Sequence, residues 1–308
     1  MSKFIPERPP YRRERLIVGY LMLAVFAILF ALRIPKLIFH FSLDSAVGAL
    51  IVSVAAFALP LLVFVLIRGK GYTRTLRLRL PQGCHIPLLI AAFFALFSGT
   101  LLLSILCGGF EALGRTAAAM EATDTTSVGG LLLRAPLVAV LPAILEDFLF
   151  RGIVVAEYER RGAWRALLFS AMLFALAHFD ARNLLAFVFS GVVLTLVLLA
   201  TNSLLATMLL HALYHVTVLL THTYLYALYR YTGNVLLFVF AWIVVLLVSL
   251  LLFTHFGARL YRRRDEVRLR DPRRDVPWNV QFYTILDALT DPPLLLCLGL
   301  AITALIIL

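Results

Sequence analysis

The sequence predicts an all-α, polytopic transmembrane helix bundle of about eight to nine spans. Three observations support this fold class. The 308 residues are 62% hydrophobic and only 15% charged, whereas soluble domains are nearer half apolar and a quarter charged. The apolar runs are long and unbroken, which favours helices over a barrel in lipid. Most lysines and arginines lie between these runs rather than within them.

Each crossing needs roughly 20 apolar residues. The candidate spans are 16–32, 46–67, 86–107, 131–156, 164–180, 184–200, 203–229, 234–256 and 292–308. The last span is short and follows VPWNVQFYTILDAL, a stretch whose pattern is typical of an interfacial helix. We therefore expect residues 1–308 to form a single membrane domain. Within it, 131–230 would hold the core helices, and 257–291 a basic cytoplasmic loop with an interfacial helix.

The distribution of basic residues predicts the orientation. With the N-terminus in the cytoplasm, the inside segments hold 21 Lys and Arg residues and the outside segments hold five, as the positive-inside rule requires. No small-residue cleavage site follows the first apolar run, so we expect a retained helix rather than a removed signal peptide. The short loops are typical of a bacterial inner-membrane protein, and we expect an integral protein of that membrane with a cytoplasmic N-terminus.

The net charge of +11 points to anionic lipid headgroups, because the basic residues flank the spans. We expect no nucleic-acid partner. The three cysteines, Cys84, Cys107 and Cys297, are scattered, and this spacing indicates neither a disulfide framework nor a metal cluster.

Ionisable residues inside the predicted spans are the candidates for function, because a charge in mid-membrane costs a few kcal/mol or more. The segment LPAILEDFLFRG holds Glu146, Asp147 and Arg151. Asp147 and Arg151 are four residues apart and can pair along one helix face. Glu146 is rotated by about 100° from Asp147 and can point elsewhere. The alternative is an ordinary helix end with snorkelling charges.

Histidines mark two further spans. In FALAHF, Phe174 and His178 are four residues apart and share a face, although a lone histidine at a helix end is often structural. In HALYHVT, His211 and His215 have the same spacing. That spacing suits metal ligation, or two hydrogen-bond donors aimed at one point.

The depth of these residues supports a common site. At about 1.5 Å of rise per residue, Glu146, His178, His211 and His215 lie roughly 12–21 Å from the cytoplasmic ends of their spans. In a hydrocarbon core of roughly 30 Å, they therefore cluster around the midplane.

The order of these motifs resembles the CPBP family of intramembrane proteases, which includes the type II CAAX prenyl endopeptidases. The motifs are an acidic pair followed by Arg151, then Phe174 with His178, then His211 with a partner four residues on. The resemblance covers about 140–217. The family has two glutamates in the first motif, where this chain has Asp147 second. It usually has Asn or Asp at the end of the third motif, where this chain has His215.

The resemblance implies a glutamate-activated water without a cofactor. Glu146 would be the general base, His178 would help to position and deprotonate the water, and His211 and His215 would stabilise the oxyanion. The supporting residues would be Asp147, Arg151 and Phe174. The expected substrate is a membrane-anchored peptide or protein, lipidated or not, within the bilayer.

Three other functions fit the same residues. A zinc-dependent protease could use His178, His211, His215 and Glu146 as ligands. However, the sequence has no His-Glu-xx-His motif, and a ligating Glu146 would leave no obvious base. The bundle could also be a non-catalytic scaffold with a decayed site, or a transporter with a proton relay.

Overall fold

The computed structural model describes residues 9–39, 46–69, 72–121, 135–221, 227–268 and 278–307, and within these ranges it contains helices and no strand. The predicted all-α bundle is confirmed. The main helices are α1 (Pro9–Phe39), α4 (Ile86–Glu121), α8 (Ala163–Ala177), α9 (Leu184–Thr201), α10 (Leu204–Thr221), α12 (Val235–Arg268) and α14 (Pro292–Ile307). The shorter ones are α2 (Ala46–Val52), α3 (Leu59–Arg68), α6 (Leu141–Asp147), α7 (Val155–Tyr158), α11 (Ala227–Thr232) and α13 (Trp278–Leu289).

Short π- and 3₁₀-helical turns join or extend these helices. The π-helical turns are η1 (Ser53–Ala58), η4 (Ala135–Val140) and η5 (Phe148–Val154). The 3₁₀ turns are η2 (Tyr72–Leu76), η3 (Gly83–His85) and η6 (Glu159–Arg161).

Six helices in the described ranges are long and apolar enough to cross a membrane. They cover Arg15–Pro35, Ala46–Arg68, Gly83–Gly108, Leu184–Thr201, Leu204–Thr221 and Val235–Arg262. Two shorter apolar helices, α8 and α14, lie where spans 164–180 and 292–308 were predicted. The predicted fourth span is a continuous helical segment from Ala135 to Arg161 that includes two π-helical turns. This segment carries the charged residues of the first motif.

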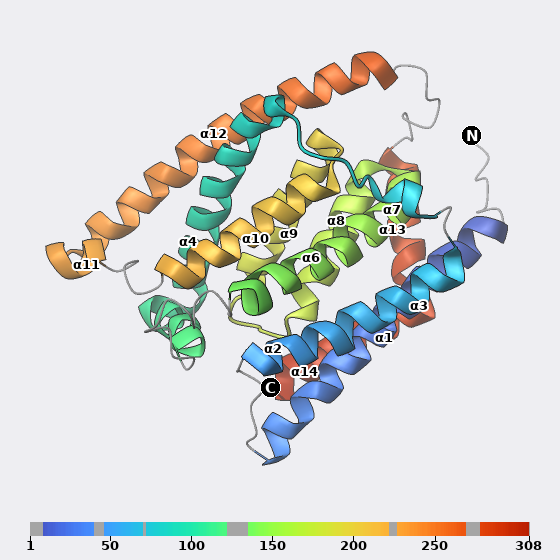
Figure 1. Ribbon diagram of the computed structural model, residues 1–308, viewed down its shortest axis with the longest axis horizontal. Coiled ribbons are helices and arrows are strands. Elements are labelled where there is room, and N and C mark those ends of the chain that lie inside the picture. Colours follow the sequence, from blue (N-terminus) through green and yellow to red (C-terminus); the bar gives the residue numbers. More distant parts are fainter. Residues whose placement is uncertain are drawn as a thin grey trace.

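The helices are arranged around this charged segment (Figure 1). Helices α4 and α12 pack against each other along one side of the bundle, and α1 packs with α14 along the opposite side. Between them lie α6, α8, α9 and α10. Helix α8 packs on α9, and α10 packs on both α6 and α9. The segment with the charged residues of the first motif is therefore surrounded by other helices, as a membrane bundle requires.

Two hydrophobic clusters hold the bundle together. The larger joins side chains of α1, α3, η5, α8 and α14, among them Phe26, Phe150, Phe174 and Cys297. The smaller joins α4, α9, α10 and α12, around Leu96, Leu194 and Phe253. Glycine permits α8 and α9 to approach closely, because a Cβ on Gly191 of α9 would lie 2.7 Å from the Cα of Ala171 on α8.

Several predicted boundaries differ from the structure. Helix α4 continues to Glu121, so the chain stays helical beyond the predicted span 86–107, which fits the helix-forming Ala, Glu and Met residues that follow it. Helix α12 likewise continues into the predicted 257–291 loop, and α13 forms over most of the predicted interfacial stretch. Residues 122–134, 222–226 and 269–277, which belong to the predicted loop, core and basic-loop ranges, lie outside the described residues.

Candidate active site

The helical segment that carries the acidic pair has an irregular backbone. Glu146 and Asp147 end α6, with the π-helical turns η4 before it and η5 after it. Pro142 lies at the start of α6 and has no backbone N–H to continue the regular hydrogen-bond pattern. Isolated π-helical turns often occur at functional sites, because they change the direction of the side chains that follow. Here they set the rotation of the acidic pair and of Arg151 within the bundle.

Asp147 and Arg151 form a fully buried ion pair. The Oδ1 atom of Asp147 lies 2.9 Å from a terminal nitrogen of Arg151, and both side chains have no exposed surface. The guanidinium group also lies over the ring of Phe174, 4.1 Å from its centroid, an arrangement that stabilises a cation in an apolar site. Arg151 is thus held by a carboxylate and by an aromatic face at the same time.

The same carboxylate contacts the third motif. Oδ1 of Asp147 lies 3.4 Å from Nδ1 of His211. Since a carboxylate only accepts, this contact favours a proton on Nδ1. Asp147 therefore joins Arg151 to His211, a role that its position in the sequence did not predict.

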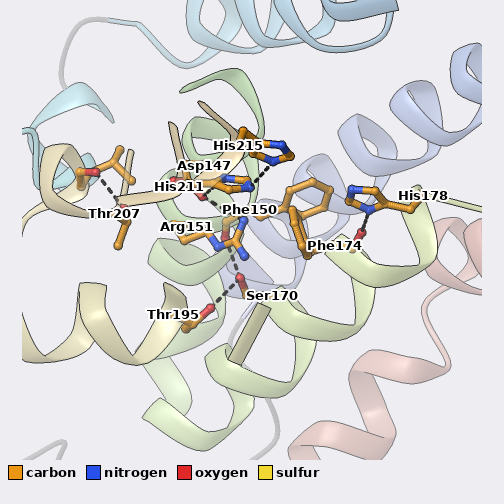
Figure 2. A network of polar contacts seen from close by, with 11 residues as sticks. Asp147, Phe150, Arg151, Ser170, Phe174, His178, Thr195, Thr207, His211 and His215 are labelled. Atoms are coloured by element: carbon orange, nitrogen blue, oxygen red, sulfur yellow. Dashed lines mark hydrogen bonds and ion pairs between the residues drawn. The ribbon is translucent and has the colours of Figure 1, made fainter. Parts of the chain in front are cut away.

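His211 and His215 bond directly to each other. Their Nε2 atoms are 2.9 Å apart, and such a bond requires one nitrogen to donate and the other to accept. With the proton of a neutral His211 on Nδ1, Nε2 of His215 donates to Nε2 of His211. The side chains of Asp147, His211 and His215 thus form one line of polar contacts (Figure 2). The sequence spacing predicted two donors aimed at one point, whereas in this structure the two rings face each other.

His178 is fixed at the end of α8. Its Nδ1 lies 2.8 Å from the carbonyl oxygen of Phe174, and because a carbonyl only accepts, Nδ1–H is the donor. Nε2 is then the nitrogen with the free lone pair. The imidazole stacks on Phe187 of α9 at 3.9 Å between centroids and meets the edge of Phe174 at 4.8 Å. Its tautomer and orientation are therefore both determined by neighbours.

Phe174 lies at the centre of the site. Its ring contacts His178 on one side and His211 of α10 on the other, with centroids 4.8 and 5.8 Å away. It also meets Phe150 edge to face at 5.5 Å. Figure 2 shows this ring between the imidazole of His178 and the His211–His215 pair. Three helices that are separate in sequence, α6 with η5, α8 and α10, therefore converge on one phenyl ring.

Glu146 lies beside this network without joining it. Its carboxylate interacts electrostatically with His211, Arg151 and Asp147. Its Oε2 atom is shielded from solvent and has no hydrogen-bond partner among the described residues. Within the same residues, no hydrogen bond joins Glu146 to His178. A buried acceptor without a partner is costly.

Two small polar side chains, Ser170 and Thr195, form hydrogen bonds that link the helices around the site. Ser170 of α8 donates to the carbonyl oxygen of Phe150 in η5 at 3.1 Å, and Thr195 of α9 donates to Ser170 at 3.1 Å (Figure 2). All three residues are buried. These bonds link α9, α8 and the π-helical turn that carries Arg151. Sequence reasoning missed Ser170 and Thr195, because a serine or threonine inside a membrane helix usually bonds its own backbone and gives no spacing signal.

The residues proposed for zinc are not arranged as a ligand set. Among the described residues, no group of three or more His, Cys, Asp or Glu side chains is placed to hold a metal ion. The Nε2 atoms of His211 and His215 are hydrogen-bonded to each other. Joint ligation with His178 and Glu146 would therefore require this bond to open and the side chains to move.

The comparisons with known proteins agree with the sequence motifs. Neither a curated protein nor a solved structure matches the chain. A family model described as type II CAAX prenyl endopeptidase, Rce1-like, matches residues 128–217. That segment contains Glu146, His178, His211 and His215, and it excludes α1 to α4 and α11 to α14. The resemblance predicted from the motifs is thereby confirmed over residues 128–217, which are similar to the Rce1-like type II CAAX prenyl endopeptidase family.

Proposed function

We propose that this integral membrane protein is an endopeptidase that hydrolyses a peptide bond of a membrane-associated substrate with a water activated by Glu146. The observation that carries the proposal is the convergence of three helices on Phe174. Beside this ring lie three imidazoles and the carboxylate of Glu146, whose Oε2 atom has no hydrogen-bond partner among the described residues. Such groups are costly in hydrocarbon, which favours a functional reason for their presence.

In the proposed reaction, Glu146 removes a proton from a water molecule while the water oxygen attacks the substrate carbonyl carbon. Nε2 of His178, the nitrogen with the free lone pair, accepts a hydrogen bond from the same water and orients it. The carbonyl double bond opens, and its electron pair moves onto the oxygen. When the tetrahedral intermediate collapses, the C–N bond breaks and the protonated Glu146 returns its proton to the leaving amine.

The third motif would stabilise the oxyanion. One N–H is shared between His211 and His215, and a developing negative charge on the substrate oxygen would compete for it. Opening this bond would turn His215 Nε2–H toward the oxyanion, where removing one donor typically costs about 100-fold or more in kcat. Asp147 would keep His211 in the tautomer with its proton on Nδ1, and Arg151 would neutralise Asp147.

The description of the matched family suggests the substrate class. We propose that the chain cleaves membrane-anchored peptides, among them prenylated C-terminal tails, near the midplane of the bilayer. Mapping the termini of membrane proteins in cells that produce the wild type or the Glu146→Gln variant tests this. New termini that require Glu146 support the proposal, and identical sets of termini from the two strains contradict it.

Replacing His215 with asparagine tests the oxyanion role. An amide N–H₂ can donate to His211 and to the substrate oxygen, so His215→Asn should keep activity within about tenfold of the wild type. His215→Leu removes the donor and should lower kcat about 100-fold. Leu213→Ala, at a lipid-exposed position of the same helix, serves as the control. Equal losses for the asparagine and leucine variants would exclude donation by this side chain.

Removing metal ions separates the glutamate mechanism from the zinc alternative. We expect purified protein to keep its cleavage rate after dialysis against a strong zinc chelator, and to contain zinc well below one ion per chain. The physical reason is that the proposed base acts on water without a Lewis acid. Loss of activity on chelation, with recovery on added zinc, would favour the alternative ligand set.

A further inference from the structure

The C-terminal end of α8, which carries His178, is bonded to an arginine of α1, a helix far from α8 in the sequence. Arg33 of α1 donates to the carbonyl oxygen of His178 at 2.5 Å and to that of Phe179 at 3.3 Å. Its guanidinium group also lies 5.2 Å from the centroid of the Phe179 ring. The sequence placed Arg33 among the few basic residues of the outside segments. In the structure it contacts the backbone of a candidate catalytic residue.

These two carbonyl groups need such a partner. The last carbonyls of a helix have no N–H of their own helix to accept from, and in a membrane no bulk water replaces it. A cation at a helix C-terminus also interacts favourably with the helix dipole. Arg33 supplies two donors and a positive charge at the point where α8 ends.

The turn after His178 depends on its neighbours. Phe179 has a φ of +50°, a left-handed conformation that side chains with a Cβ rarely adopt. Its ring is buried and meets Phe26 and Phe30 of α1 edge to face, at 5.7 and 6.5 Å between centroids. Helix α1 therefore holds both the ring and the backbone of this turn, and Arg33 makes the polar part of that contact.

This turn also fixes the position of the His178 imidazole. The backbone of His178 caps α8, while its ring is bonded to the Phe174 carbonyl and stacked on Phe187. A shift of the capping residue would move Nε2 relative to the site, because the ring follows its own Cα. Errors of about 1 Å in the placement of a catalytic group cost about 100-fold in rate.

We infer that Arg33 is a positioning residue for His178: it locks the C-terminal turn of α8 so that the Nε2 lone pair of His178 points into the site. This inference rests on the proposed function for its effect on catalysis. It assigns a role in the site to α1, which lies outside the matched segment 128–217. Arg33 itself would touch neither the substrate nor the water.

The test compares Arg33→Gln and Arg33→Lys with Arg15→Gln. Arg15 lies at the opposite end of the same helix and pairs with Asp287 and Asp291, so its loss weakens the attachment of α1 far from His178. Each protein is reconstituted in nanodiscs with ¹⁵N-labelled histidine rings. The ring nitrogens of His178 are assigned from their absence in His178→Gln. Thermal unfolding, and kcat and KM on a farnesylated peptide with a CAAX terminus, are measured in parallel.

We expect Arg33→Gln to shift the ring resonances of His178 away from a single Nδ1–H tautomer. It should lower kcat about 10–100-fold and leave KM within about threefold of the wild type. Arg33→Lys should recover part of both effects. Arg15→Gln should lower the thermal midpoint without changing the His178 resonances or kcat. Unchanged His178 resonances and unchanged kcat in Arg33→Gln would overturn the inference.

If the proposed protease function is wrong, the experiment gives a result that differs from the one that would overturn the role of Arg33. If the farnesylated peptide is not cleaved, or if Glu146→Gln cleaves it as the wild type does, the protease assignment fails. The ring resonances still decide whether Arg33 positions His178, because they are measured without substrate.

Discussion

Glu146→Gln should reduce peptide-bond cleavage by purified protein about 1,000-fold or more, at the upper part of the range for general-base catalysis. The amide is nearly the same size as the carboxylate but cannot take a proton from water. The Oε2 atom of Glu146 is shielded and has no hydrogen-bond partner among the described residues. The variant therefore breaks no bond of this atom, and it removes a charge that is costly to bury.

The helix bundle should remain folded in this variant. We expect a thermal midpoint equal to or above that of the wild type, measured in the same detergent. Glu159→Gln is the matched control. Glu159 lies in the turn η6, away from the site, where it pairs with Arg77. The same substitution at this position should leave the cleavage rate unchanged. A Glu146→Gln protein that is folded and cleaves at the wild-type rate would exclude Glu146 as the base.

Asp147→Ala should cause the largest loss of stability, about 3–5 kcal/mol, because it leaves the guanidinium group of Arg151 buried without its partner. Neither side chain of this pair has exposed surface, so water cannot replace the lost carboxylate. The measurement is unfolding in mixed micelles, compared with an alanine substitution of a buried residue of similar size, Thr195.

The double variant Asp147→Leu with Arg151→Met distinguishes charge from packing. Replacing both members of a buried ion pair with apolar residues is often neutral or stabilising, so most of the lost stability should return. Activity should not return, because His211 would have lost the carboxylate that favours a proton on its Nδ1 atom. A double variant as unstable as Asp147→Ala would show that the ion pair does not explain the loss.

Much of the bundle could be predicted from hydropathy and charge, because lipid permits few alternatives. Long apolar runs must be helices in a membrane, and each predicted span has a helix in the structure. The length of α8 was harder to predict, since its hydrophobic run continues through His178 to Phe179. The helix ends at Ala177 because the next residues turn through a left-handed conformation.

The candidate site motifs were visible because they place charges within apolar spans, where hydrophobicity disfavours them. The spacing of Asp147 and Arg151 predicted their pairing, and the spacing of Phe174 and His178 predicted a shared face. Spacing within one helix says nothing about contacts between helices. The contact of Asp147 with His211 could therefore not be read from the sequence.

The role of Arg33 was hidden for a related reason. Near a predicted helix end it looked like an ordinary flanking cation, and only the packing of α1 beside α8 brings it to the His178 carbonyl. The π-helical turns around Glu146 were also missed. Their sequences contain no residue type that distinguishes them from regular helix.

A double-mutant cycle between Glu146 and His178 tests whether the two side chains act on one water molecule. We expect Glu146→Asp and His178→Gln each to keep a measurable rate, and the rate of the double variant is compared with the product of the single losses. If the two residues act as a unit, the double variant should be at most about threefold slower than the slower single variant. Losses that multiply in full would mean that the two side chains work independently, and would exclude a shared water molecule.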